Sequence, residues 1–248
     1  MPEKPPHPDV FDEDFARRRD AARKRLDAID PARQHGGALA DPKRREWFEA
    51  VYALADDDAA GVPWGNLAAH PLLQDWLARD RGLSGASALD VGCGLGDNAA
   101  ALAEWGAKVT AFDFVPRAVE WARCRFADKG VTFVAADLFA APADWREAFD
   151  FVHETYTLQA LPSELLPAAR QALADFVKPG GRLLVISRAR DEAQKIDGPP
   201  WPLARRDVEA IANCGLVVEQ LEDVLAPSTG VRHWRVLFRK PSALSRLP

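Results

Sequence analysis

The sequence predicts a doubly wound α/β fold, with a mainly parallel sheet of seven strands, a C-terminal antiparallel hairpin and an N-terminal helical cap. Three observations predict it. From residue 86 onward short apolar runs alternate with helical patterns, whereas the chain before residue 83 shows only helical patterns. Near the C-terminus two apolar runs follow each other without a helical pattern between them. Such alternation is typical of a parallel sheet with helices on both faces.

The N-terminal part divides into a leader and a cap. Residues 1–8 are rich in proline and charge, and we expect them to be disordered. Helices are predicted over 9–30, from about 42, and around 72–79, because apolar residues recur there at helical spacing. We therefore expect a helical cap over 9–82 and an α/β domain over 83–248.

The α/β domain is predicted element by element from its apolar runs. The strand runs read ASALDV, AKVTAFDF, VTFVAAD, FDFVHE and RLLVISRA, followed by LVVEQLEDV and RHWRVLFRK. Helical patterns lie near 98–105, 117–126, 163–177 and 203–213. The last two runs have no helix between them, so they predict the antiparallel hairpin.

Composition and charge restrict the function. The 248 residues carry 37 acidic and 32 basic side chains, a formal net charge of -5, which argues against a general nucleic-acid binder. The three cysteines are scattered and form no CxxC pair, so we expect neither a disulfide framework nor a metal site. No signal-type or bilayer-length apolar run is present, so we expect a cytoplasmic protein without a membrane partner. The sequence does not indicate an oligomeric state.

A glycine-rich segment, ALDVGCGLGDN at 88–98, follows the first predicted strand and opens a helix. Gly92, Gly94 and Gly96 allow a tight turn and a close approach of the backbone to a ligand, which the free N–H groups of the helix would also face. The dinucleotide fingerprint would need its third glycine at position 97, where this chain has Asp97. This disfavours a dehydrogenase, whereas an acidic residue there could accept hydrogen bonds from a cationic cofactor.

Aspartates stand at the ends of three successive predicted strands, Asp90, Asp113 and Asp137. Doubly wound sheets bind ligands at this carboxyl edge. Asp113 could take the two hydroxyls of a ribose, and Phe114 offers a face to an adenine ring. Asp137 could accept from the adenine amino group.

This ordered set resembles the class I S-adenosylmethionine-dependent methyltransferases, a Rossmann-like family, over about residues 86–240. The resemblance implies S-adenosyl-L-methionine as cofactor and makes 83–248 its binding domain. Asp90 and the 92–96 loop would hold the methionine part, with Cys93 as a small space-filling residue. Asp113 and Phe114 would hold the nucleoside, and Asp137 with Leu138 the adenine.

Three shorter segments resemble the thiopurine and thiol/halide methyltransferase group: residues 47–52, VPWGNLAAHPLL at 62–73, and GPPWPLARRDVEAI at 198–211. The resemblance implies that Trp47 and Trp64 cover the cofactor or the acceptor. It also implies a soft acceptor, most simply a thiol. The polar run FDFVHETYTLQALP at 149–162 departs from that group, which has a less polar segment there.

The end of the fourth strand supplies the candidate catalytic residues, His153, Glu154 and Tyr156. His153 or Glu154 could be a general base if it reaches the acceptor. Alternatively, Glu154 holds the cofactor's ammonium, His153 packs beneath a loop beside the cofactor, and Tyr156 forms a pocket wall.

The sequence therefore predicts an enzyme that transfers a methyl group from S-adenosylmethionine to a small molecule. Two alternatives stay open: methylation of a nitrogen in a small metabolite, and a regulatory protein that binds the cofactor without turnover.

Overall fold

Seven strands form one sheet in the order β3-β2-β1-β4-β5-β7-β6. The computed structural model describes residues 13–34, 43–80, 82–196, 198–227 and 229–242, so the predicted leader lies outside the described residues. The strands are β1 Ser87–Val91, β2 Lys108–Asp113, β3 Thr132–Ala135, β4 Phe149–Thr155, β5 Val177–Arg188, β6 Val217–Leu225 and β7 Arg232–Arg239. Strands β1 to β5 pair in parallel, whereas β7 is antiparallel to both β5 and β6. This confirms the predicted fold class.

The strand order reverses between β1 and β4, because the chain moves outward to β3 on one side and continues through β5 on the other. At such a point the loops after two adjacent strands diverge and leave room for a ligand at the carboxyl edge. The loops after β1 and β4 carry the glycine-rich segment and the predicted catalytic residues, respectively.

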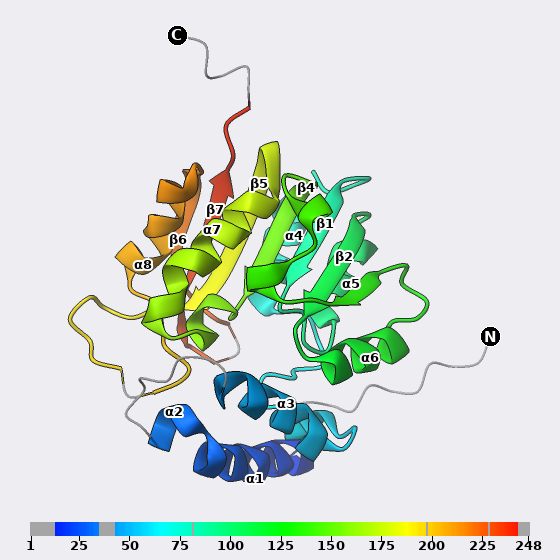
Figure 1. Ribbon diagram of the computed structural model, residues 1–248, viewed down its shortest axis with the longest axis vertical. Helices are drawn as coiled ribbons and strands as arrows, with labels where there is room; N and C mark the ends of the chain where they lie inside the picture. Colours follow the sequence, from blue (N-terminus) through cyan, green and yellow to red (C-terminus); the bar gives the residue numbers. More distant parts are fainter. Residues whose placement is uncertain (1–12, 35–42, 81, 197, 228, 243–248) are drawn as a thin grey trace.

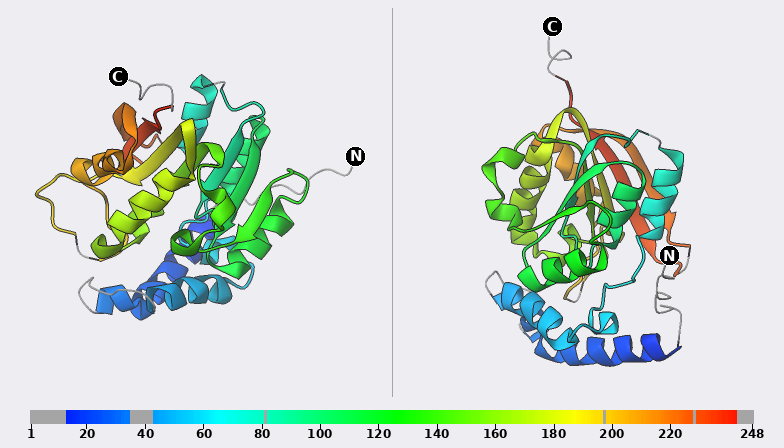
Figure 2. Two further views of the ribbon diagram at one scale, coloured as in Figure 1. Left: turned by 45° about the horizontal axis from the view of Figure 1, so that its top comes forward. Right: turned by 90° about the vertical axis from the view of Figure 1, so that its right-hand side faces the viewer.

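Helices cover both faces of the sheet (Figures 1 and 2). They are α1 Glu13–Ile29, α2 Pro31–Gln34, α3 Lys43–Ala55, α4 Pro71–Arg79, α5 Asp97–Glu104, α6 Pro116–Arg125, α7 Leu166–Phe176 and α8 Arg205–Glu209. Within the described ranges, six 3₁₀ turns lie at Ala59–Gly61, Leu138–Ala140, Ala143–Trp145, Leu158–Ala160, Ser163–Leu165 and Ala210–Cys214. One core cluster packs α7 against the sheet, and a second packs α4, α5 and α6 against the other face.

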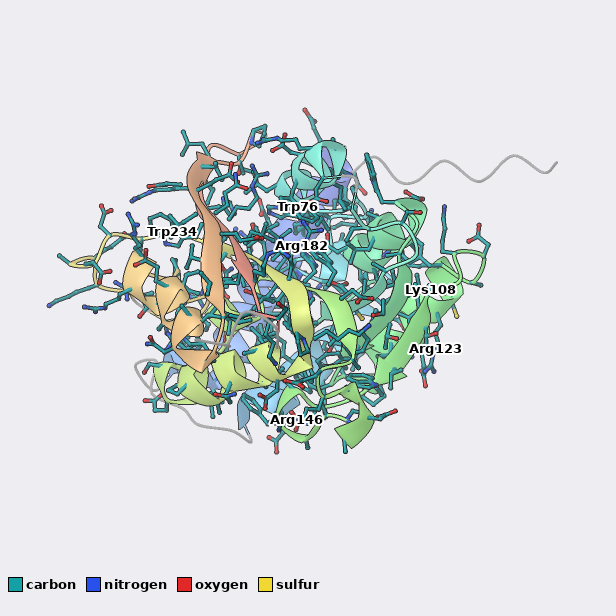
Figure 3. All side chains as sticks on the ribbon, turned by 90° about the horizontal axis from the view of Figure 1, so that it is seen from above. Trp76, Lys108, Arg123, Arg146, Arg182 and Trp234 are labelled. Carbon is teal, nitrogen blue, oxygen red and sulfur yellow. The ribbon has the colours of Figure 1, made fainter. Side chains whose placement is uncertain are left out.

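Helix α4 packs on the sheet rather than with the other N-terminal helices. Trp76 stacks on Phe151 of β4 with ring centroids 5.0 Å apart, and the Arg182 guanidinium lies 5.4 Å from the Trp76 ring (Figure 3). Leu73 and Leu77 are fully buried in the same cluster. The division of the chain at residues 82 and 83 stays a prediction, but α4 is anchored to the α/β domain.

The first three helices lie across one end of the sheet, where the loops after β1 and β2 emerge (Figure 1). Leu26 of α1 packs with Trp47 and Val51 of α3, and Tyr52 of α3 packs with Leu95 of the glycine loop. None of the helices in the described ranges is long and apolar enough to cross a membrane.

Candidate functional site at the carboxyl edge

The glycine loop after β1 takes a backbone path that requires glycine. Gly92, Gly94 and Gly96 have φ of 64°, 51° and 86°, and Gly96 is the N-cap of α5. A Cβ on Gly92 would lie 2.5 Å from Thr157 Oγ1, and one on Gly94 would lie 3.3 Å from Tyr52 Oη. The loop therefore passes close to the segment after β4 on one side and to the cap on the other.

Asp113 at the end of β2 fastens this loop. Its Oδ2 accepts from Gly94 N and its Oδ1 from Val115 N, both at 3.0 Å. Burial raises the pKa of this carboxyl to about 6, although the backbone hydrogen bonds oppose the shift. With Phe114 N as a third backbone donor, the carboxyl still has acceptor capacity left, as the predicted contact with a ribose hydroxyl requires.

Two other residues of the glycine-rich segment, Asp97 and Cys93, are less available to a ligand than the sequence indicates. The Asp97 carboxylate forms a two-pronged pair with Arg125 of α6, with both contacts at 2.8 Å, so its charge is neutralised within the protein. Burial raises the pKa of the Cys93 thiol well above its ordinary value, which keeps the thiol neutral. Cys93 N donates to Phe112 O at 2.8 Å.

Asp90 and His153 are direct neighbours on β1 and β4. His153 Nδ1 lies 2.7 Å from Asp90 Oδ1, and its Nε2 lies 2.9 Å from Thr155 Oγ1. The ring is fully buried, and both of its nitrogens have partners within the sheet. Asp90 Oδ2 is buried and has no hydrogen-bond partner among the described residues. A catalytic or cofactor-binding role for His153 stays a prediction; the geometry lets it orient Asp90.

Glu154 points to the opposite face of the sheet from His153, because successive side chains of a strand alternate. Its Oε2 accepts from Thr157 N at 2.9 Å and from Leu158 N at 3.4 Å. Its Oε1 is buried and has no partner in the described ranges. Burial raises the pKa of Glu154 to about 8, and the nearby Asp90 adds to the shift. The carboxyl is therefore mainly protonated at neutral pH.

We expect Glu154→Gln to flatten the pH dependence of stability. The folded-state pKa of about 8 exceeds the ordinary value of 4.5, so the stabilisation from protonation is complete below pH 4.5 and is lost as pH rises to about 8. One such group changes the free energy of unfolding by at most about 1.4 kcal/mol per pH unit. Urea unfolding of both proteins at pH 5 and pH 9 should show a smaller fall for the variant. An equal fall would show that Glu154 is ionised throughout.

Aromatic side chains of the cap close over the loop. Trp64 Nε1 donates to Tyr52 Oη at 3.0 Å, and Trp47 Nε1 donates to Leu26 O at 3.1 Å. The ring centroids of Trp47 and Trp64 are 6.1 Å apart, and Phe48 contacts both rings and Phe114. The structure thus brings Trp64 to the glycine loop, whereas Trp47 packs one layer further out against α1.

The residues predicted to hold the adenine meet a side chain that the sequence analysis missed. Arg45 of α3 lies 2.7 Å from Asp137 Oδ2, and its guanidinium lies 4.8 Å from the centre of the Phe114 ring. Asp137 Oδ1 accepts from Phe139 N at 2.9 Å, and Leu138 is buried in the core. The adenine-binding roles of Asp137, Leu138 and Phe114 stay predictions, and a nucleoside there would share this space with Arg45.

Tyr156, in the turn after β4, joins two histidines that the sequence analysis did not select. Its Oη lies 2.9 Å from His70 Nε2 and 2.7 Å from His233 Nε2. His70 is the N-cap of α4, and His233 lies at the start of β7. No local sequence signal links the three, because the contact needs both the docking of α4 and the insertion of β7. Within the described ranges, no three His, Cys, Asp or Glu side chains are grouped as a metal site.

Comparison with known proteins finds similarity to methyltransferases over part of the chain. Residues 88–181 match a family model described as a methyltransferase domain. The chain is 39% identical over 125 residues to a ubiquinone biosynthesis O-methyltransferase of Xylella fastidiosa, a match that covers 48% of each chain. It is 34% identical over 147 residues to the enzyme of that name from Aromatoleum aromaticum, which covers 58% of this chain and 61% of the relative. The chain thus spans about half the length of the curated relatives it matches.

Solved structures share the fold. A protein whose structure concerns the conversion of a disulfide bond into a thioacetal group during echinomycin biosynthesis has a TM-score of 0.66 at 24% identity, over 81% of this chain and 94% of that one. The 1,6-didemethyltoxoflavin-N1-methyltransferase of Burkholderia thailandensis has a TM-score of 0.64 at 21% identity, over 83% and 92% of the two chains. At such identities the likeness concerns the fold alone.

Proposed function

We propose that this chain is a class I S-adenosylmethionine-dependent methyltransferase that transfers a methyl group from that cofactor to a small-molecule acceptor, which the match of residues 88–181 to a methyltransferase domain supports. The observation that carries the proposal is two unpartnered buried carboxyl oxygens near the glycine loop, one on each face of the sheet. Asp90 Oδ2 and Glu154 Oε1 have no hydrogen-bond partner among the described residues, and they end the two strands between which the sheet order reverses. Buried carboxyls in such a place call for a cation or a donor.

The described residues fit the cofactor. It carries an ammonium and a sulfonium, whose positive charges suit the buried Asp90 carboxyl and would favour ionisation of Glu154, and it supplies an electrophilic methyl group when bound. The glycine loop packs closely against Thr157 and Tyr52, so its backbone can approach a ligand without side chains, and Asp113 lies beside the loop. The aromatic cap would exclude water from the site, which prevents hydrolysis and strengthens electrostatic interactions.

A thiol is the acceptor class we propose first, on the resemblance of residues 47–52, 62–73 and 198–211 to the thiopurine and thiol/halide group. A hydroxyl is the second candidate, favoured by the 39% identity to the Xylella fastidiosa O-methyltransferase. A nitrogen acceptor, or binding without turnover, stays as the alternative that the sequence leaves open.

The test is a direct assay of product. Purified protein is incubated with S-adenosylmethionine and a matched set of benzenethiol, phenol and aniline, and mass spectrometry detects S-adenosylhomocysteine and the methylated ring. Calorimetry measures cofactor binding in parallel. We expect binding and acceptor-dependent turnover, fastest with the thiol. Binding without turnover across a wide panel would favour a regulatory protein, and absence of binding would overturn the proposal.

A further inference from the structure

We infer that His70, Tyr156 and His233 form a one-directional proton relay that removes the proton of the methyl acceptor, with Tyr156 Oη contacting the acceptor and His233 Nε2 as the terminal base. This inference rests on the proposed function and assigns the acceptor class: a neutral hydroxyl or thiol whose attacking atom carries a proton at the working pH. Sequence patterns single out neither histidine for this role.

The direction of the hydrogen bonds in the relay is fixed at both ends. Leu72 N donates to His70 Nδ1 at 3.3 Å, so the proton of a neutral His70 is on Nε2, and His70 donates to Tyr156 Oη. His233 Nδ1 lies 2.7 Å from Val231 O, which can only accept, so the neutral His233 ring has its lone pair on Nε2. Tyr156 Oη must therefore donate to His233 Nε2.

The surroundings keep both imidazoles neutral. Burial lowers the pKa of His70 to about 3, and His233, His153 and Arg188 add to the shift. Burial also lowers the pKa of His233, helped by Arg188 and opposed by the bond to Val231. Burial raises the pKa of Tyr156, opposed by Arg188, whose guanidinium lies 5.9 Å from the tyrosine ring. At neutral pH the phenol is thus protonated and His233 is free to accept.

Tyr156 is the member that can meet an acceptor. His70 and His233 are buried, whereas Tyr156 is half-buried. The phenol oxygen donates to His233 and accepts from His70, and its second lone pair also receives a hydrogen bond from the Arg188 guanidinium, whose place the acceptor would take. Tyr156 also has φ of 71°, a left-handed conformation that costs about 1–3 kcal/mol in a residue with a side chain and concentrates at functional sites.

The relay adjoins the glycine loop through two contacts. Thr157, the next residue, donates from Oγ1 to Val91 O at 3.1 Å and lies against Gly92. On the other side, His70 N donates to Asn98 Oδ1 in the first turn of α5 at 2.8 Å. Tyr156 is therefore held at the edge where the methyl group would be presented.

In the proposed step the acceptor X–H bond breaks, and its proton passes to the Tyr156 oxygen while the Tyr156 proton passes to His233 Nε2. The electron pair freed on X forms the bond to the methyl carbon, and the carbon–sulfur bond breaks with its electron pair left on sulfur. His233 ends as an imidazolium that donates to Val231 O, and its proton is later lost to solvent.

The experiment compares Tyr156→Phe with the unmodified protein on two aryl thiols. One carries electron-withdrawing groups and is ionised at pH 7, and the other is largely protonated. The phenyl ring keeps the contacts of Tyr156 with His70 and His233, whose ring centroids lie 5.2 Å and 5.8 Å away, so we expect folding and cofactor binding to be retained. On the protonated thiol, single-turnover methylation should fall about 10²- to 10⁴-fold, the range of general-base catalysis. On the ionised thiol it should change little.

An equal loss on both thiols would make Tyr156 a positioning residue, and no loss on either would remove it from the mechanism; both outcomes overturn the inference. Binding without turnover in the unmodified protein would instead refute the proposed function. Independently of turnover, ¹⁵N NMR of labelled histidines at pH 7 should show His70 protonated on Nε2 and His233 on Nδ1, with the His233 signals moved in Tyr156→Phe. The opposite tautomers would overturn the relay.

Discussion

Gly92→Ala is expected to destabilise the protein by about 2–4 kcal/mol and to weaken cofactor binding at least about tenfold, from backbone strain and overpacking together. Gly92 has φ of 64°, and its Cβ would lie 2.5 Å from Thr157 Oγ1. Thr157 has little freedom to move, because its Oγ1 donates to Val91 O and its backbone N donates to Glu154 Oε2. The loop must shift instead, and Asp90 lies two residues before it. Urea unfolding and calorimetry of cofactor binding measure the two effects.

Gly130→Ala is the matched control. Gly130 has φ of 68°, and nothing lies within 4 Å of the position its Cβ would take. The free energy of unfolding of this variant should fall only by the cost of a left-handed backbone, about 1–2 kcal/mol. The variant should bind the cofactor normally. Equal losses in the two variants would show that the space beside Gly92 is not restricted by Thr157.

A second substitution separates the contact from the strain. Thr157→Ala removes the oxygen that the new Cβ would meet, so the double variant Gly92→Ala/Thr157→Ala should be more stable than the sum of the single losses predicts. Contacting residues commonly show coupling of about 0.5–3 kcal/mol. Additive losses would mean that the loop relaxes in another direction.

The features that sequence predicted well are those set by local rules. The alternation of apolar runs with helical patterns indicated the sheet, and the missing helix between the last two runs indicated the hairpin. Gly92, Gly94 and Gly96 were predicted as a turn, and all three have positive φ. Such features depend on neighbours in the chain, so a single sequence carries them.

The alternation of side chains along a strand distinguishes two residues, His153 and Glu154, that the sequence analysis treated as equivalent. His153 and Glu154 are adjacent, so in a strand they must point to opposite faces. His153 accordingly meets Asp90, whereas Glu154 meets the backbone of Thr157. The alternation of side chains along the FDFVHE run is therefore sufficient, by itself, to assign the two candidates to different sides of the sheet.

Contacts between distant segments could not be predicted. Arg45 reaches Asp137 only because α3 lies across the sheet edge, and Arg125 neutralises Asp97 only because α6 lies beside the glycine loop. His233 reaches Tyr156 because β7 lies next to β5. The charge and size of these side chains are ordinary in their own helices and strands, so the pattern contains no signal for the pairing.

Arg235→Met is expected to lower the free energy of unfolding by about 1–3 kcal/mol, because it leaves the buried Leu72 O without its donor and removes the buried cation that pairs with Glu222 and Asp75. Arg235 is 2% exposed and lies on β7. It donates to Glu222 of β6 at 2.5 Å and 2.9 Å, and to Leu72 O and Asp75 Oδ2 of α4 at 2.9 Å and 2.6 Å. One guanidinium therefore joins the C-terminal hairpin to the helix that His70 caps.

Arg232→Met on the same strand is the matched control. Arg232 also has two carboxylate partners, Asp191 and Asp223, but its side chain is 36% exposed. Exposed ion pairs contribute about 0–1 kcal/mol, so this variant should unfold at nearly the same urea concentration as the unmodified protein. If the two variants lost equal stability, the burial of Arg235 would not explain the contribution of its ion pairs to stability. A loss confined to Arg235→Met, together with weaker NMR signals for the His70–Tyr156 contact, would show that the hairpin fixes α4 and with it the donor end of the relay.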